Sequence, residues 1–414
     1  MRILIKKVNI FDGHNSELVR NASIVIDDNI VYEICKGEVL EDCFDMVIDG
    51  AGRTAMPGMV ESHVHLGFLF GGASSVSTID FDIAVSAAVA RKLLYKGFTT
   101  VRDASGIVQG LKKAFDLNVL EGPRIYPSNS CLTQTCGHGD MYDHTIRELQ
   151  YRVPTFSVLV DGADEVRRGV REQFYKGASQ IKIMAGGGCS SEHDPIQTLQ
   201  FSFEEMKAAV DAAKDYGTYV MAHLYTPEAM MRAGKAGVKS FEHAHMMDEE
   251  AARMIVSNGI FVAPMPQFNK PRNQKNVVFD KKKAAKAELV RARENTATEL
   301  INKYNIPILF GSDLMIFKPD YELPEGEDLS IYKKRFGSFK ALLSTTGYAN
   351  DIIKLTTYQN PYADGKIGVL CEGSYADILL VDGNPVKDVD ILTDEDNIKL
   401  IMKDGQVYKN TLTA

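Results

Sequence analysis

Hydrophobic and polar residues alternate in short runs at both ends of the chain. Near the N-terminus, residues 22–26 and 30–34 alternate on either side of Asp27-Asp28-Asn29, a pattern typical of a β-hairpin with a tight turn. Near the C-terminus, the apolar runs 376–381 and 398–402 are each followed by an Asp-Gly pair, which favours tight turns. Both termini are therefore predicted to supply antiparallel strands to one small β-domain.

The central part of the chain instead repeats an apolar strand followed by an amphipathic helix. Residues 203–213 and 248–256 show the helical period. This alternation predicts a parallel sheet covered by helices. Eight strands are predicted, and they end near these residues: His63, Asp103, Ser128, Met184, His223, His243, Pro264 and Asp313. An open, doubly wound sheet is the alternative, but it would gather its functional residues at one crevice.

The predicted fold class is therefore α/β, with a TIM-type (β/α)₈ barrel and a small β-sandwich domain built from both chain termini. The predicted boundaries assign residues 1–57 plus 364–414 to the sandwich and residues 58–363 to the barrel. Residues 268–298 are rich in lysine and alanine and are predicted to form a charged helical insertion. We expect this insertion to be an exposed, mobile cover with no chemistry of its own.

Composition limits the class of protein and its partners. A chain of 414 residues with 45% hydrophobic residues can bury a large core. The net charge of −8, with acids and bases interspersed, predicts no nucleic-acid partner and favours a small molecule or dipeptide, while leaving a homo-oligomer open. The six cysteines have no paired spacing, so no disulfide framework is expected. The sequence shows no signal-peptide pattern and no apolar run that could span a bilayer. We therefore expect a cytoplasmic location and no association with a membrane.

Two histidines, His63 and His65, lie two positions apart on the first predicted barrel strand. Side chains at this spacing point to the same side of a strand, so both imidazoles can reach one metal ion. The spacing alone is equally consistent with two packed or solvated histidines.

A lysine, Lys182, lies within the otherwise apolar fourth predicted strand. Burial lowers the pKa of a lysine and frees the neutral amine. Such an amine can take up CO₂ to give a carbamate, which binds metals as a carboxylate does. The alternative is a lysine that reaches solvent from the strand end or pairs with an acid.

Three further candidates lie at the ends of later strands, namely His223, His243 and Asp313. Each of them alone could be a buried or capping residue with its hydrogen bonds satisfied. Together with the earlier candidates they fit a site for two metal ions, because barrel enzymes keep their chemistry at the carboxyl ends of the strands.

The order of these residues resembles the binuclear, carboxylated-lysine branch of the amidohydrolase superfamily. Residues 47–58 and 365–378 also resemble those enzymes. The resemblance implies two divalent ions with six ligands: His63, His65 and Asp313 on the more buried ion, His223 and His243 on the other, and Lys182, as its carbamate, between them. Histidine, aspartate and carbamate ligands suit zinc best.

Within that superfamily, residues 137–140 and His223-Leu-Tyr225 resemble the prolidase-like group of cytosolic Xaa-Pro and Xaa-Arg dipeptidases, which is related to imidazolonepropionase. Residues 132–136 depart from the group's usual glycine doublet, which bears on the placement of His138. The resemblance implies a dipeptidase or amidase in which a metal-bridging hydroxide attacks an amide of a dipeptide or N-acyl amino acid. Asp313 would move the proton, His138 would polarise the carbonyl, and Tyr225 would bind the oxyanion or a substrate carboxylate.

Two alternatives stay open from the sequence. A cyclic amide hydrolase or deaminase of the imidazolonepropionase type would generally lack the lysine ligand on the fourth strand. A non-catalytic binding scaffold would have lost at least one ligand, and all six are present. No role is predicted for His14, His144, His193 and His245, which are expected to be surface or hydrogen-bonded histidines.

Overall fold

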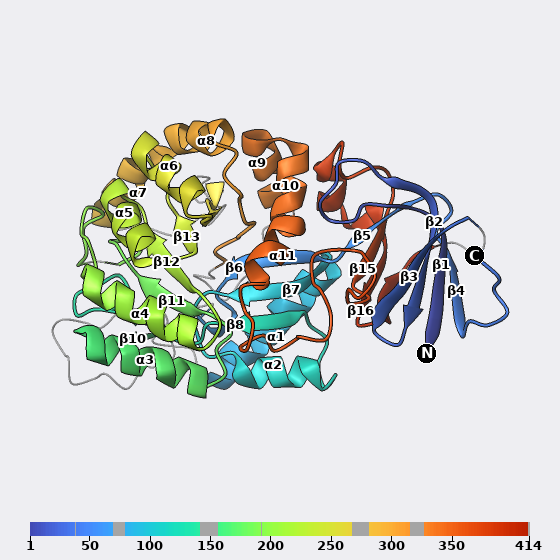
Figure 1. The fold of residues 1–414 in the computed structure, drawn as a ribbon, viewed down its shortest axis with the longest axis horizontal. Coiled ribbons are helices and arrows are strands. Elements are labelled where there is room, and N and C mark those ends of the chain that lie inside the picture. The colour runs from blue at the N-terminus through green and yellow to red at the C-terminus, as the bar shows by residue number, and fades with distance from the viewer. Residues whose placement is uncertain are drawn as a thin grey trace.

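A barrel and a terminal β-domain lie side by side in the computed structural model (Figure 1). The structure describes residues 1–37, 39–68, 79–140, 156–191, 193–266, 281–314 and 327–412. The α/β fold class is confirmed, while the exact domain boundaries stay a prediction. None of the described helices is long and apolar enough to cross a membrane.

Strands from both termini form one eight-stranded sheet: β1 (Arg2–Ile10), β2 (Val19–Asp27), β3 (Ile30–Lys36), β4 (Met46–Asp49), β5 (Thr54–Pro57), β15 (Ile378–Val381), β16 (Ile398–Lys403) and β17 (Gln406–Asn410). The two ends of the chain meet where β5 pairs in parallel with β1 and antiparallel with β15. Residues of β1, β2, β15 and β16 share one apolar core, so the terminal strands enclose a core of their own.

The predicted turns of this domain are largely confirmed. Asp28 and Asn29 join β2 to β3, and Asp404-Gly405 joins β16 to β17. The pair Asp382-Gly383 does not close a hairpin, because two short 3₁₀-helices, η4 (Val389–Thr393) and η5 (Glu395–Asn397), separate β15 from β16.

The barrel strands follow the predicted order: β6 (Met59–Val64), β7 (Phe98–Asp103), β8 (Arg124–Pro127), β9 (Cys131–Thr133), β11 (Ile181–Met184), β12 (Val220–Leu224), β13 (Ser240–His243), β14 (Phe261–Ala263) and the extended segment 306–314. The third predicted strand, expected to end near Ser128, corresponds to β8. The short β9 that follows it, and β10 (Ser157–Leu159), which pairs with β9, were not predicted.

Segment 306–314 closes the ring between the last and first strands. The backbone N–H of Leu309 donates to Val262 of β14 at 2.8 Å, and that of Ser62 in β6 donates to Phe310 at 2.8 Å. On the other side, the N–H of Ser179 donates to the carbonyl of Pro127, the last residue of β8, at 2.7 Å. All strand carboxyl ends therefore lie at one end of a barrel, as expected for an enzyme site.

Helices cover the outside of the barrel (Figure 1). They are α1 (Ile79–Tyr95), α2 (Gln109–Asp116), α3 (Ala163–Tyr175), α4 (Phe203–Asp215), α5 (Pro227–Ala236), α6 (Glu249–Ser257), α7 (Lys281–Arg291), α8 (Glu294–Lys303), α9 (Glu327–Phe336), α10 (Ser338–Thr345) and α11 (Gly347–Ile353), with the short η1 (Leu66–Phe68) after β6. The two helices predicted from periodicity are α4 and α6. Ser202 forms a capping box with Glu205, and Asp248 caps α6, so local sequence determines where both begin.

A buried charge pair fixes the barrel against the terminal sheet. The guanidinium of Arg124 in β8 is buried and donates to Asp377, beside β15, and to Asp404. Removing one partner of such a buried pair leaves an uncompensated charge, so the pair links the two parts of the molecule.

The predicted insertion is partly described. Residues 281–298 contain α7 and the start of α8, whereas residues 268–280 lie outside the described residues.

Candidate active site

All six predicted metal ligands and both further catalytic candidates line one cleft at the carboxyl ends of the barrel strands. The space in the cleft is about 470 Å³ when the solvent at its open mouth is included, and it is lined by His63, His65, His138, Phe156, Lys182, Met184, Cys189, Ser190, His223, Tyr225, His243 and Asp313. Residues distant in the sequence meet here because most of them lie in or after parallel strands whose carboxyl ends gather at one end of the barrel.

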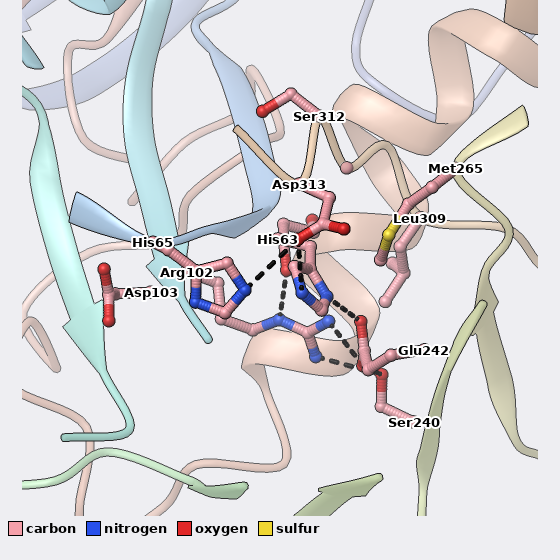
Figure 2. A network of polar contacts seen from close by, with 12 residues as sticks. His63, His65, Arg102, Asp103, Ser240, Glu242, Met265, Leu309, Ser312 and Asp313 are labelled. Carbon is pink, nitrogen blue, oxygen red and sulfur yellow. Dashed lines mark hydrogen bonds and ion pairs between the residues drawn. The ribbon is translucent and has the colours of Figure 1, made fainter. Parts of the chain in front are cut away.

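Three of these residues form a compact ligand group. Donor atoms of His63, His65 and Asp313 all lie within 4.8 Å of one another. Asp313 Oδ1 is 3.2 Å from His65 Nε2 and 3.6 Å from His63 Nε2, and Figure 2 shows both rings turned toward the carboxylate. Two imidazole nitrogens and a carboxylate oxygen are donors that a divalent transition metal accepts.

Two ligand candidates have an unfavourable backbone conformation. His243 has a φ of 75° and Asp313 a φ of 47°, in the left-handed region that residues with a Cβ rarely adopt. Asp313 is held there by its N–H, which donates to the carbonyl of His63 at 2.9 Å. Strain of this kind is concentrated at functional sites, so it agrees with a functional role for both strand ends.

The orientation of His63 is set by a buried carboxylate. Its Nδ1 lies 2.6 Å from Glu242 Oε2, and Glu242 accepts from Arg102 at 3.0 Å and from Ser240 at 2.5 Å (Figure 2). Burial alone would raise the pKa of Glu242, but the charge of Arg102 and the hydrogen bond from His63 lower it below its ordinary value. An ionised Glu242 accepts the Nδ1 proton, so Nε2 presents its lone pair to the cleft.

A carbonyl and a second buried acid hold His65 and the turn after it. His65 Nδ1 lies 3.3 Å from the carbonyl oxygen of Ser105, so its Nε2 also faces Asp313. Asp103, at the end of β7, accepts from the backbone N–H of Leu66 at 2.7 Å. Asp103, at a predicted strand end, therefore holds the backbone just after His65 in place and is not itself a metal-ligand candidate.

Lys182 neither reaches solvent nor pairs with an acid. Its side chain is 1% exposed, it lines the cleft, and no described residue forms a hydrogen bond or ion pair with its amine. Burial lowers its pKa, although Glu242 raises it through charge. An ammonium without a close counter-charge is costly at such a site.

His223 and His243 form a second pair of imidazoles, with ring centroids 4.6 Å apart. His223 Nε2 is buried and has no hydrogen-bond partner among the described residues. Burial lowers the pKa of both rings well below the ordinary value, which favours the neutral form that binds metals. A buried nitrogen without a partner fits a ligand atom whose partner is an ion.

His138 and Tyr225 pack against this second pair. The ring of His138 stacks on His223 with centroids 4.2 Å apart, and the ring of Tyr225 stacks on His243 at 5.1 Å. Burial raises the pKa of the Tyr225 hydroxyl well above its ordinary value, so the hydroxyl keeps its proton and can donate a hydrogen bond. Both side chains can thus contact a molecule bound in the cleft.

Comparison with known proteins places this site in a family. The model of the amidohydrolase family matches residues 54–408. This chain belongs to the amidohydrolase family. A prolidase complexed with N-methylphosphonate-L-proline is 32% identical, with a TM-score of 0.89, over 99% of this chain and 100% of that chain.

Two further relatives of this amidohydrolase match over nearly the whole chain. A Xaa-Pro dipeptidase with methionine bound in the active site is 28% identical, with a TM-score of 0.81, over 99% of this chain and 100% of that chain. The ochratoxinase of Aspergillus niger is 28% identical over 420 residues, which cover 95% of this chain and 84% of the relative. This amidohydrolase is accordingly a hydrolytic enzyme of the prolidase-like group.

The site of this amidohydrolase contains residues that the sequence did not reveal. Glu242 directly precedes His243 in one apolar strand, and Arg102 lies in another, β7. A charged residue in an apolar strand is a signal from which both could have been predicted as site residues. Phe156 and Cys189 gave no such signal, because apolar cleft residues look like core residues in a sequence.

The remaining histidines differ in their outcome. His14 and His193 are exposed, as expected, and His144 lies outside the described residues. His245 is buried and forms a hydrogen bond with the backbone of Met265, the second of the two expected outcomes, and its ring centroid lies 5.6 Å from that of Tyr225 and 6.0 Å from that of His243. It therefore packs behind the second pair of imidazoles.

Proposed function

We propose that this amidohydrolase cleaves the amide bond of a dipeptide or N-acyl amino acid, and that its cleft binds two divalent ions for this reaction. Zinc suits the candidate ligands best. The observation that carries the proposal is the convergence of six potential ligands on one cleft, among them the buried and unpaired Lys182. The similarity to a prolidase, a Xaa-Pro dipeptidase and an ochratoxinase supports an amide as the substrate.

The six residues fit the ions that the family implies. His63, His65 and Asp313 would hold one ion, and His223 and His243 would hold the other. Lys182, as its carbamate, would lie between the two. The negative charge of the carbamate would be compensated by the ions, whereas the ammonium form of the lysine would be a buried positive charge. Bound divalent ions supply Lewis acidity, which lowers the pKa of water and polarises a carbonyl group.

The chain's own residues would move the proton and bind the substrate. Asp313 would take the proton from the attacking water and return it to the leaving amine, two duties that one carboxylate can alternate. His138 would hydrogen-bond the substrate carbonyl, and the protonated hydroxyl of Tyr225 would bind the oxyanion or a substrate carboxylate.

An apolar wall fits the side chain of such a substrate. Phe156 and Met184 line the cleft, and the ring centroid of Phe156 lies 5.9 Å from that of His65. Phe68 packs against Phe156 with the two rings tilted and their centroids 4.2 Å apart. Burial of apolar area gives this wall a preference for uncharged side chains such as proline.

A hydrolysis screen with the zinc-loaded enzyme tests the proposal. Xaa-Pro dipeptides, Xaa-Arg dipeptides, N-acyl amino acids and cyclic amides would be followed by release of the free amine. We expect the wild type to hydrolyse at least one dipeptide or N-acyl amino acid. The Asp313→Asn variant and chelator-treated protein should not hydrolyse that substrate in the same screen. Turnover of cyclic amides or deamination alone would contradict the proposal.

A further inference from the structure

The insertion helix α7 reaches the active site through one lysine. Lys286 Nζ donates to three backbone carbonyls of the loop after β11, those of Gly188 at 3.1 Å, Ser191 at 2.9 Å and Asp194 at 2.7 Å. It also lies 3.6 Å from Asp194 Oδ1, and its side chain is largely buried. The described part of the insertion is therefore bonded to a loop that borders the cleft, whereas the sequence predicted only an exposed cover.

Asp194 is the centre of this loop. Its carboxylate is 1% exposed and accepts from the N–H of Gly188 at 2.8 Å, from the hydroxyl of Ser191 and from Gln200 at 3.3 Å. Burial alone would raise its pKa, but the contact with His138 and these donors lower it to about 2. The acid is thus a permanent acceptor.

His138 faces this acceptor with one ring nitrogen. Its Nδ1 lies 3.2 Å from Asp194 Oδ2 and 2.8 Å from Ser191 Oγ, whose own proton goes to Asp194. Because both neighbours accept from the ring, Nδ1 must carry a proton. Nε2 then lies on the side of Ser190, 3.5 Å from its hydroxyl, and both residues line the cleft.

Space around the ring is equally restricted. A Cβ added at Gly188 would lie 1.9 Å from His138 Cε1, so the loop backbone packs directly on the imidazole. The backbone N–H of His138 also donates to Gln200 at 2.8 Å. The ring is therefore fixed from the loop side as well as by its hydrogen bonds.

We propose that Asp194 and Lys286 are positioning residues that fix the tautomer and direction of His138, so that Nε2 serves the substrate. The role of His138 toward substrate rests on the proposed function; the tautomer does not. A carboxylate behind an imidazole fixes its tautomer and orientation in other hydrolases. Lys286 adds to this by neutralising the buried carboxylate and by tying the loop to α7.

Kinetics of the zinc-loaded enzyme test the positioning role. Asp194→Asn keeps the size of the side chain but removes its charge, and kcat is expected to fall about 10–100-fold, with a smaller change in KM and two ions retained. In a His138→Gln background the same substitution should have no further effect, because residues that act through one group are not additive. An equal fall in both backgrounds would overturn the proposal.

Lys286→Met should lower kcat, as Asp194→Asn does. This loss should also disappear in the His138→Gln background. Lys281→Met, at the exposed start of the same helix, is the matched control and should leave kcat unchanged. A loss with Lys281→Met equal to that with Lys286→Met would assign the effect to α7 as a whole and would overturn the role of Lys286.

The tautomer itself can be measured without turnover. In zinc-loaded protein with ¹⁵N-labelled histidine, the resonances that disappear in His138→Gln identify the ring of His138. We expect a protonated Nδ1 in the wild type and a weaker preference in Asp194→Asn, since an amide can also donate. A protonated Nε2 with a bare Nδ1 in the wild type would overturn the proposal, whether or not any dipeptide is hydrolysed.

Discussion

The substitution Glu242→Gln separates the orientation of a metal ligand from ligation itself. Glu242 is fully buried and is not among the residues that line the cleft; it accepts from His63 at 2.6 Å and from Arg102 at 3.0 Å. Glutamine has the same shape but only one acceptor oxygen. If that oxygen stays on Arg102, its NH₂ group faces His63 Nδ1.

Two effects follow from this change. A donor at Nδ1 favours the tautomer with the proton on Nε2, so His63 loses the lone pair that faces the ion, and metal affinity is expected to fall about 10–100-fold. Arg102 is also left buried without its counter-charge, which costs about 3–5 kcal/mol of unfolding free energy when a buried pair is broken.

The assay has two parts. Competition with a zinc chelator gives the affinity, and urea unfolding of metal-free protein gives the stability. Glu172→Gln is the control, because that acid is 43% exposed and, among the described residues, forms an ion pair with Arg168 alone, at 3.3 Å, which is worth about 0–1 kcal/mol. Metal affinity equal to that of the wild type in folded Glu242→Gln would refute the reasoning.

Three further outcomes are expected. Lys182→Ala should lose metal and activity together, with partial rescue of both by acetate or bicarbonate; elemental analysis that finds two tightly held ions in the folded variant would contradict the bridging role. Asp313→Asn should lower kcat by about 10²–10⁴-fold while much of the metal stays bound, and near-normal kcat in the metal-loaded variant would remove Asp313 from proton transfer. Gly188→Ala should displace His138 and reduce kcat, whereas Gly186→Ala, whose Cβ would have no contact closer than 3.6 Å, should not; equal activities would show that the loop tolerates the added methyl group.

Much of the fold could be predicted from local patterns. The eight predicted strand ends agree with the barrel because the strands are apolar runs, most of which end at a polar residue, as at Asp103 and His243. Ser202 and Asp248 cap α4 and α6, so the starts of these helices can be predicted from residues adjacent in the sequence. The short strands β9 and β10 could not be predicted, since they depend on how the chain fits neighbouring strands.

The candidate ligands were also visible, because histidine, lysine and aspartate at strand ends are unusual in an apolar context. Their partners were not. Glu242 is paired with Arg102 across 140 residues, and Asp194 meets Lys286 of a distant helix. Such contacts come from tertiary packing, which periodicity does not encode. The cytoplasmic location and any homo-oligomer stay predictions.

The central claim is that one cleft holds two ions and hydrolyses an amide with both. The most direct measurement is the rate of dipeptide or N-acyl amino acid hydrolysis by metal-free protein as zinc is added in known amounts, with bicarbonate present. We predict that activity rises until two equivalents per chain are bound and then stays constant. A plateau at one equivalent, with full activity, would contradict the account.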